Sequence, residues 1–302
     1  MQIRSCMQCP RKCGVERTSD NGSGFCGMGA DPVLARAALH FWEEPCISGK
    51  NGSGAVFFTG CSLKCVFCQN YEISTEHAVG KRFTPEGLAE IFKRLEAQGA
   101  HNINLVNPTH FVLPILKALE LANLSIPVVY NSGGYERMET LKLLEGAIDI
   151  YLPDLKYADN TVALRYSGAK DYVTYAQAAV LEMARQTGPA EFDENGMMKK
   201  GTIVRHLILP GNTRNSISVL EWLKQNLPQG VLVSVMAQYL PCGRAADFSE
   251  INRKITKREY EKIQNRLFEL DLDGFIQERS SAKKDFIPSF CLEGLDEENS
   301  SV

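Results

Sequence analysis

Residues 55–70 read AVFFTGCSLKCVFCQN, an apolar run typical of a β-strand followed by a loop with three cysteines. Cys61, Cys65 and Cys68 have the spacing C-x3-C-x2-C, which brings three thiolates together within eight residues. Three thiolates on one loop suit an iron–sulfur cluster better than a structural zinc ion, which usually takes four protein ligands. Three cysteines also leave one iron of a cubane cluster open to bind a small molecule. A structural zinc ion and a trio of buried thiols are the alternatives.

Outside this stretch, short apolar runs alternate with helical patterns. Strands are expected at 55–60, 103–106, 127–131, 149–152, 204–209 and 231–236, with a last short strand at 273–277. Helices are expected at 85–98, 112–122, 136–144, 159–186 with a break near Gly168, 216–225 and 256–270, and a β-hairpin at 190–203. Repeated βα units of this length predict an α/β fold whose parallel sheet is closed or partly closed into a barrel. Six main strands are fewer than the eight of a complete barrel.

The composition predicts a full hydrophobic core without a strong overall charge. The chain has 302 residues, 44% of them hydrophobic, and a net charge of −3. The lack of a basic field makes nucleic acid or an anionic membrane an improbable partner. No apolar run approaches the length of a membrane span and the N-terminus has no apolar signal segment, so we expect a soluble, cytoplasmic protein. In such a protein, ten cysteines point to metal ligation rather than disulfides.

Three segments of the chain differ in composition. Residues 1–54 form a Cys-rich module, residues 55–280 carry the βα units, and residues 281–302 are a charged and polar tail that we expect to be disordered at its end.

The Cys-rich module contains a second cysteine motif. Cys6, Cys9, Cys13 and Cys26 follow the pattern C-x2-C-x3-C-x12-C, which resembles a four-thiolate metal site. Zinc would make the module structural, whereas a second iron–sulfur cluster would make it an electron relay or a substrate anchor. The spacing does not decide between the two, and free cysteines are the alternative.

Polar residues follow the expected strands at their carboxyl ends, which form the working face of α/β folds. Asn131 and Ser132 end the third strand and offer donors and acceptors suited to ribose hydroxyls, although an ordinary glycine turn also explains them. Asp154 and Lys156 follow the fourth strand and share one face at strand period. A plain ion pair at a strand end is the alternative.

The first cysteine motif resembles the signature of the radical S-adenosylmethionine (SAM) enzymes. It carries an aromatic residue, Phe67, just before its last cysteine, and Gly60 and Asn70 flank it. In that family the open iron chelates SAM, and the reduced cluster cleaves SAM to a 5′-deoxyadenosyl radical that abstracts a hydrogen atom from a substrate. The resemblance implies a [4Fe–4S] cluster and SAM as cofactors, and a partial (β/α)₆ barrel as the fold.

Over roughly residues 1–280, the chain is similar to homologues of pyruvate formate-lyase-activating enzyme. Four phrases carry the likeness: CMQCPRKCGVER, GCSLKCVFCQN, GAHNINLVNPTHF and DIYLPDLKY. Activating enzymes of this kind abstract a hydrogen from a backbone glycine of a large partner enzyme. The resemblance therefore implies a protein or peptide substrate and an electron donor such as flavodoxin or ferredoxin.

The same resemblance assigns residues to SAM. Asp154 and Lys156 match the segment that holds the methionine moiety, and His206 lies in a region where the family has a histidine near SAM. Asn107 and Thr109 stand where many members have a Gly-Gly-Glu segment that binds the SAM amino group. Together with Phe67, Asn131 and Ser132, these residues form the expected cofactor site.

The leading hypothesis is therefore an activase-like radical SAM enzyme that acts on a protein or peptide. Radical SAM modification of a small molecule or an RNA is a second enzymatic possibility, and a non-enzymatic iron–sulfur sensor is a third. The sensor would bind a cluster without turning over SAM, and the lack of a basic stripe disfavours RNA.

Overall fold

One open, mostly parallel sheet forms the centre of the molecule. The computed structural model describes residues 2–282 and 288–295, and within them the sheet has ten strands. The parallel strands are β2 (Ser53–Phe58), β4 (Ile103–Val106), β5 (Val128–Ser132), β6 (Ile150–Pro153), β8 (Met198–Leu207), β9 (Leu232–Met236) and β10 (Gly274–Ile276). The antiparallel strands are β1 (Val33–His40), β3 (Lys81–Arg82) and β7 (Glu191–Phe192). The order is β10-β9-β8-β6-β5-β4-β2-β1-β3, with β7 paired to β8.

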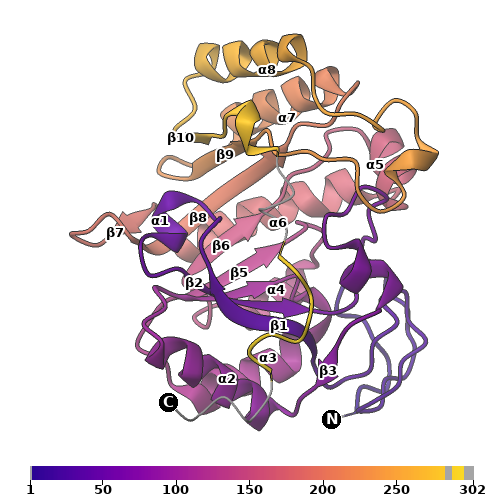
Figure 1. Cartoon of the computed structure of the whole chain (residues 1–302), viewed down its shortest axis with the longest axis vertical. Helices are drawn as coiled ribbons and strands as arrows, with labels where there is room; N and C mark the ends of the chain where they lie inside the picture. The colour runs from indigo at the N-terminus through magenta and orange to yellow at the C-terminus, as the bar shows by residue number, and fades with distance from the viewer. Residues whose placement is uncertain (1, 283–287, 296–302) are drawn as a thin grey trace.

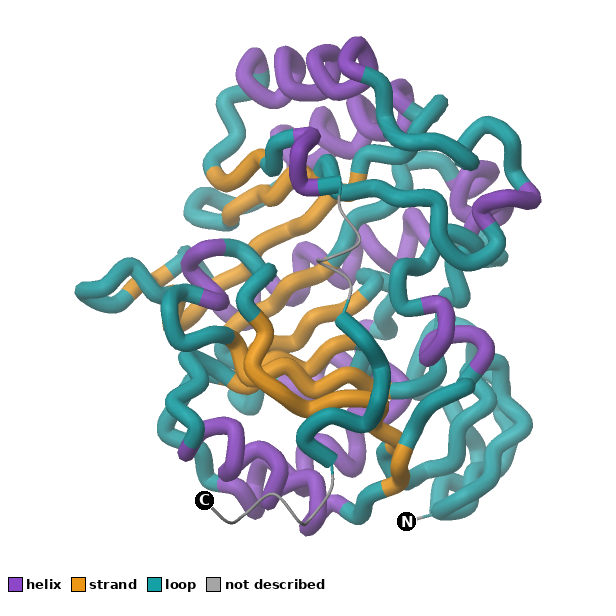
Figure 2. Tube along the Cα trace, viewed as in Figure 1, coloured by secondary structure: helices purple, strands orange, loops and turns teal. Residues whose placement is uncertain are grey.

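Helices alternate with the parallel strands along the chain (Figures 1 and 2). They are α1 (Pro45–Ser48), α2 (Pro85–Ala97), α3 (Val112–Ala122), α4 (Met138–Leu144), α5 (Asn160–Ser167), α6 (Tyr172–Thr187), α7 (Thr213–Asn226) and α8 (Lys257–Glu269). In the view of Figure 1, α4 and α6 lie behind the sheet, α2 and α3 lie below it, and α7 and α8 lie above it. This arrangement is the partial α/β barrel that the sequence predicts, and it brings the carboxyl ends of the parallel strands to one edge.

The helix α2 shows how local sequence builds this arrangement. Thr84 Oγ1 accepts a hydrogen bond from the backbone N–H of Gly87 at 3.2 Å, and Pro85 occupies the first turn. The residues of its apolar face, predicted at helical spacing, are all buried: Leu88, Ile91, Phe92 and Leu95. They pack into a core with β2 and β4, so the helix fixes the strand that leads into the first cysteine loop.

Two other local predictions are also confirmed. The long helical stretch breaks at Gly168, where α5 ends and the chain continues to α6. The expected hairpin is the pairing of β7 with β8 around the turn that includes Gly196.

The strand β1 was not predicted. It pairs antiparallel with β2 and so extends the sheet beyond the parallel strands. Its sequence, VLARAALH, is rich in alanine and has few of the β-branched and aromatic residues that usually mark a strand. Burial of Leu34 and Ala35 and pairing with β2 override this weak propensity. Thus part of residues 1–54 belongs to the main sheet, and β2 itself begins at Ser53.

Part of the C-terminal tail lies against β1. The segment 288–295 crosses the front of β1 in Figure 1, where it is drawn in yellow. Phe290 is buried and its ring meets Phe57 at a centroid distance of 5.5 Å, and Glu293 forms an ion pair with Arg36 at 2.8 Å. The end of the tail, residues 296–302, for which we expect disorder, lies outside the described residues.

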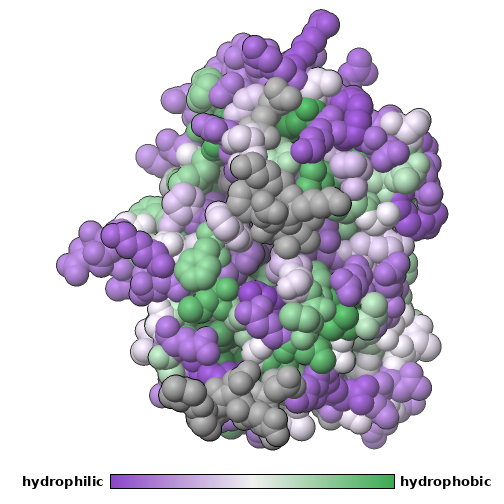
Figure 3. Space-filling model, viewed as in Figure 1, coloured by the Kyte–Doolittle hydropathy of each residue, from purple (hydrophilic) through white to green (hydrophobic). Residues whose placement is uncertain are grey.

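The surface is mixed in character. On the face in Figure 3, hydrophilic residues gather on α8 and on the β7–β8 hairpin, and hydrophobic ones appear nearer the centre. Among the helices of the described chain, none has the length and apolar character needed to cross a membrane.

Candidate functional site

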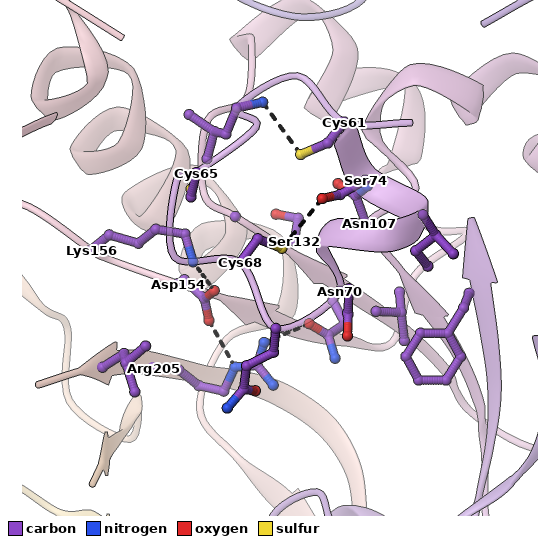
Figure 4. A pocket seen from close by; sticks show the side chains of 18 of the residues that line it. Cys61, Cys65, Cys68, Asn70, Ser74, Asn107, Ser132, Asp154, Lys156 and Arg205 are labelled. Carbon is purple, nitrogen blue, oxygen red and sulfur yellow. Dashed lines mark hydrogen bonds and ion pairs between the residues drawn. The ribbon is translucent and has the colours of Figure 1, made fainter. Parts of the chain in front are cut away.

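The three cysteines of the first motif lie on the loop that follows β2, at the carboxyl edge of the sheet. Each sulfur accepts a hydrogen bond: Cys61 Sγ from the backbone N–H of Leu63 at 3.3 Å, Cys65 Sγ from Ser167 Oγ at 2.9 Å, and Cys68 Sγ from Ser74 Oγ at 3.4 Å. All three cysteines line one cavity of about 230 Å³ (Figure 4). The loop therefore presents three hydrogen-bonded sulfurs to a common space.

Burial dominates the electrostatics of Cys65 and Cys68. Burial raises the pKa of the Cys68 thiol to about 12. Burial also raises the pKa of Cys65, and the positive charge of Lys156 opposes this rise. Within the described residues, no three His, Cys, Asp or Glu side chains are arranged to hold a single metal ion. A cubane cluster binds its ligands through separate irons, so its thiolates need not meet at one ion.

A row of three charged residues, Lys156, Asp154 and Arg205, lies beside the cysteine loop (Figure 4). Asp154 forms an ion pair with Lys156 and a second with Arg205, the latter at 3.0 Å. Burial acts to raise the pKa of Asp154, but the charges of Lys156 and Arg205 bring it below its usual range. Burial acts to lower the pKa of Lys156, and the Asp154 carboxylate raises it instead. All three side chains are therefore charged at neutral pH.

Arg205 and Glu43 are cavity residues that sequence reasoning did not assign. Arg205 Nη1 forms an ion pair with Glu43 Oε2 at 3.0 Å. Glu43 Oε1 accepts hydrogen bonds from the side-chain amides of Asn104 and Asn131, each at 3.1 Å. The alternation of side chains between the two faces of β8 was the available signal for Arg205. Glu43 lies in the unpredicted connection between β1 and α1 and belongs to no motif.

Besides Asp154 and Lys156, four more of the predicted cofactor residues line the same cavity: Phe67, Asn107, Asn131 and Ser132. Phe67 packs against Tyr239 at a ring-centroid distance of 5.9 Å. Asn107 donates a hydrogen bond to the carbonyl of Gly60, next to the first cysteine. The fold thus brings residues from the ends of β2, β4 and β5 to the cysteines.

Two predicted residues lie outside the cavity lining. His206 is fully buried, and its ring nitrogens contact the Leu155 carbonyl at 2.7 Å and Ser216 Oγ at 2.9 Å. Burial lowers the pKa of His206 to about 4, so the ring is neutral. It points to the opposite face of β8 from Arg205, and it ties the end of β6 to α7 rather than lining the site. Thr109 begins a 3-10 helix, where its hydroxyl donates to Glu136 Oε1 at 2.6 Å.

Glu136 is a buried carboxyl whose hydrogen-bond partners, Thr109, Tyr130 and Ser132, are all uncharged. Burial raises its pKa from 4.5 to about 7. The folded state holds this proton while the unfolded chain releases it, so stability from this group is complete below pH 4.5 and is lost as pH rises through about 7.

We therefore expect Glu136→Gln to flatten the pH dependence of stability. The free energy of unfolding of the wild type should fall by roughly 3 kcal/mol more between pH 5 and pH 8 than that of the variant. Urea unfolding at both pH values measures this difference. Glu120→Gln, at a side chain that is 72% exposed, is the matched control and should behave as the wild type. Parallel pH dependences of wild type and Glu136→Gln would contradict the assignment.

The geometry agrees with comparisons to known proteins. The model of the radical SAM superfamily matches residues 55–223, which include the cysteine loop and the strands up to β8. A relative from Methanocaldococcus jannaschii, named only as Uncharacterized protein MJ0674, is 32% identical over 271 residues, covering 86% of this chain and 73% of the relative. The chain belongs to the radical SAM superfamily. Membership implies a [4Fe–4S] cluster and SAM as cofactors, and it makes this protein an enzyme.

One solved structure shares the fold. SuiB from Streptococcus suis superposes with a TM-score of 0.50 at 13% identity, over 74% of this chain and 47% of SuiB. This chain thus spans about half the length of SuiB. A domain of pyruvate-formate lyase-activating enzyme from Bacteroides vulgatus gives a TM-score of 0.39 at 16% identity, over 64% of this chain and 91% of that domain.

Proposed function

We propose that this enzyme holds a [4Fe–4S] cluster on Cys61, Cys65 and Cys68, cleaves SAM beside it, and removes a hydrogen atom from a protein or peptide substrate. The observation that carries the proposal is the convergence of these three cysteines with the Asp154–Lys156 pair on one cavity at the carboxyl edge of the sheet. The three cysteines suit a cluster as ligands, because each sulfur accepts one hydrogen bond and such bonds orient and stabilise thiolate ligands.

When bound on Cys61, Cys65 and Cys68, a cluster would supply the electron for reductive cleavage of SAM. The residues of this chain bind and orient SAM for that event. Lys156, whose pKa is raised, pairs with the methionine carboxylate, and Asp154, whose pKa is lowered, pairs with the ammonium group. Asn131 and Ser132 face the ribose hydroxyls. The methionine end of SAM is thus held by opposite charges that the protein keeps ionised.

The charged row is held in place by burial and by its neighbours. The side chains of Asp154 and Lys156 are 14% and 16% exposed. Arg205 bonds the second oxygen of Asp154 at 3.0 Å, which leaves the carboxylate oriented before SAM arrives. Preorganised charges in a site with little water act more strongly than the same charges in solution.

Access to the cavity supports a large substrate. Trp42 lines the cavity and is 55% exposed, so the cavity reaches the surface beside this side chain. A peptide segment or glycyl loop can enter there while the rest of its protein stays outside. The likeness of the motifs to those of activating enzymes favours the same class of substrate. The one-electron donor is a flavodoxin or ferredoxin, and the cytoplasm is the proposed location.

The first test is formation of 5′-deoxyadenosine by anaerobically reconstituted protein with SAM and dithionite. The wild type and the control Cys291→Ala, at an exposed cysteine, should both form it. The triple variant Cys61→Ala, Cys65→Ala, Cys68→Ala should form none. No product from iron-loaded wild type would favour the sensor hypothesis and contradict the proposal.

The substrate class is tested by deuterium transfer. A deuterated cell extract is separated into protein, nucleic-acid and small-molecule fractions, and each is incubated with the enzyme and SAM. Deuterium in 5′-deoxyadenosine from the protein fraction supports the proposal. Transfer from one of the other fractions alone would identify RNA or a small molecule as the substrate instead.

A further inference from the structure

We infer that Cys6, Cys9, Cys13 and Cys26 hold a second iron–sulfur cluster, beside the loop that carries the first. Its ligands are separate from those of the SAM site, and its presence is measurable by metal content alone. The inference therefore stands or falls independently of the reaction proposed above.

The four cysteines lie on two loops that fold against each other. Three of them share the first loop, which is closed by backbone hydrogen bonds from Cys6 to Val15 at 2.8 Å and from Gly14 to Cys6 at 3.0 Å. Cys26 comes from the second loop, which is joined to the first by the hydrogen bond from the backbone N–H of Phe25 to Cys13 Sγ at 3.3 Å. The topology thus gives three thiols on the first loop and a fourth on the second.

Every one of the four sulfurs has a hydrogen-bond donor beside it. The backbone N–H of Phe25 serves Cys13, and Arg17 Nη1 lies 3.6 Å from Cys6 Sγ. The backbone N–H of Arg11 serves Cys9. The backbone N–H of Met28 serves Cys26. Donors around buried sulfur stabilise thiolates, which are the form that binds metal.

Two buried side chains in the module also suit an anionic centre. Arg17 is 1% exposed, yet its hydrogen-bond acceptors, apart from the Cys6 sulfur, are neutral oxygens such as the carbonyls of Met28 and Gly29. Gln8, between Cys6 and Cys9, is 8% exposed and its Nε2 has no acceptor among the described residues. A four-thiolate centre carries net negative charge, which would compensate the positive charge of the Arg17 guanidinium. Its sulfurs would also give the Gln8 Nε2 donor an acceptor.

The fold adds to a spacing that does not decide by itself: within the described residues, no three His, Cys, Asp or Glu side chains are arranged around a single ion such as zinc, whereas a cluster binds its thiolates through separate irons. Iron–sulfur sites commonly take three cysteines from one short run and the fourth from elsewhere in the chain. Structural zinc sites more often combine two close pairs of ligands. The sulfur environments of the second motif also resemble those of Cys61, Cys65 and Cys68, where each sulfur accepts a single hydrogen bond.

The loops of the second motif are in direct contact with the loop that carries Cys61, Cys65 and Cys68. Arg11, between Cys9 and Cys13, donates to the carbonyl of Ser62 at 2.8 Å and to that of Ser167 at 3.0 Å. Ser62 follows Cys61, and Ser167 is the donor to Cys65. On the other side, a Cβ built on Gly60 would lie 3.0 Å from the Cys26 carbonyl oxygen. The second centre therefore adjoins the first loop, a position suited to passing electrons to it.

The test counts iron, acid-labile sulfide and zinc per chain after anaerobic reconstitution. In the triple variant Cys61→Ala, Cys65→Ala, Cys68→Ala, which lacks the first site, about four iron atoms and four sulfides should remain. Reduction with dithionite should give the electron paramagnetic resonance signal of a reduced cluster. Adding Cys26→Ser should remove this iron, whereas adding Cys291→Ala should not.

Circular dichroism establishes that each variant is folded. If the triple variant does not fold, Cys13→Ser and Cys26→Ser are made singly in the wild type, where each should lower the iron content by about half. A folded triple variant that binds no iron would overturn the inference. So would a triple variant that holds about one zinc ion per chain in place of iron.

Discussion

Replacing Asp154 with Asn should lower the rate of SAM cleavage by at least about 100-fold, because the change removes one carboxylate from between two buried cations. Lys156 and Arg205 both bond this carboxylate, and Arg205 retains its ion pair with Glu43 and its hydrogen bond to Asn131 afterwards. Removing one partner from a buried ion pair typically costs about 3–5 kcal/mol. Lys156 loses the anion that raises its pKa, and SAM loses the partner proposed for its ammonium group.

Single-turnover formation of 5′-deoxyadenosine and equilibrium binding of SAM separate the two consequences. We expect weaker binding as well as a slower reaction. Asp247→Asn is the matched control, because Asp247 pairs with Arg244 at 2.9 Å but both side chains are more than half exposed. An exposed pair contributes at most about 1 kcal/mol, so this variant should react as the wild type. Equal activity of Asp154→Asn and Asp247→Asn would show that the charged row does not serve SAM.

The sequence predicted the parts of the site that depend on short-range patterns. The cysteine motif follows a strand, and Asp154 and Lys156 sit two residues apart just past another, so both were placed at the working edge of the sheet. The order of strands and helices followed from apolar periodicity, which is strong in α2 and in the buried parallel strands. These features need no knowledge of the rest of the fold.

What the sequence did not predict depends on contacts between distant segments. Glu43 reaches Arg205 across the cavity only because the alanine-rich β1 pairs with β2. No local sequence pattern indicates the pairing of the strands or the ion pair. His206 and Arg205 are neighbours in the chain, and the family likeness pointed to His206. The face of β8 that meets the cavity is fixed by its register with β9, and that register turns Arg205 inward.

Replacing Gly134 with Ala should displace the charged row by a purely steric route. Gly134 has a φ of +75°, and a Cβ at this position would lie 2.2 Å from the carbonyl oxygen of Asp154. A backbone oxygen cannot rotate away as a long side chain can, so the end of β6 must move. Tyr172, which donates to the same carbonyl at 2.8 Å, would lose its fixed acceptor. We expect SAM cleavage to fall by about 100-fold or more, since small misplacement of positioning groups has effects of this size.

Gly146→Ala separates steric overlap from backbone strain. Gly146 has a similar φ of +82°, but a Cβ there meets nothing within 4 Å. The left-handed conformation alone costs an alanine roughly 1–2 kcal/mol. Urea unfolding should therefore show a loss of that size in Gly146→Ala with unchanged SAM cleavage, and a clearly larger loss in Gly134→Ala together with weaker SAM binding. If the two variants lost the same stability and both kept full activity, the contact between Gly134 and Asp154 would not position the site.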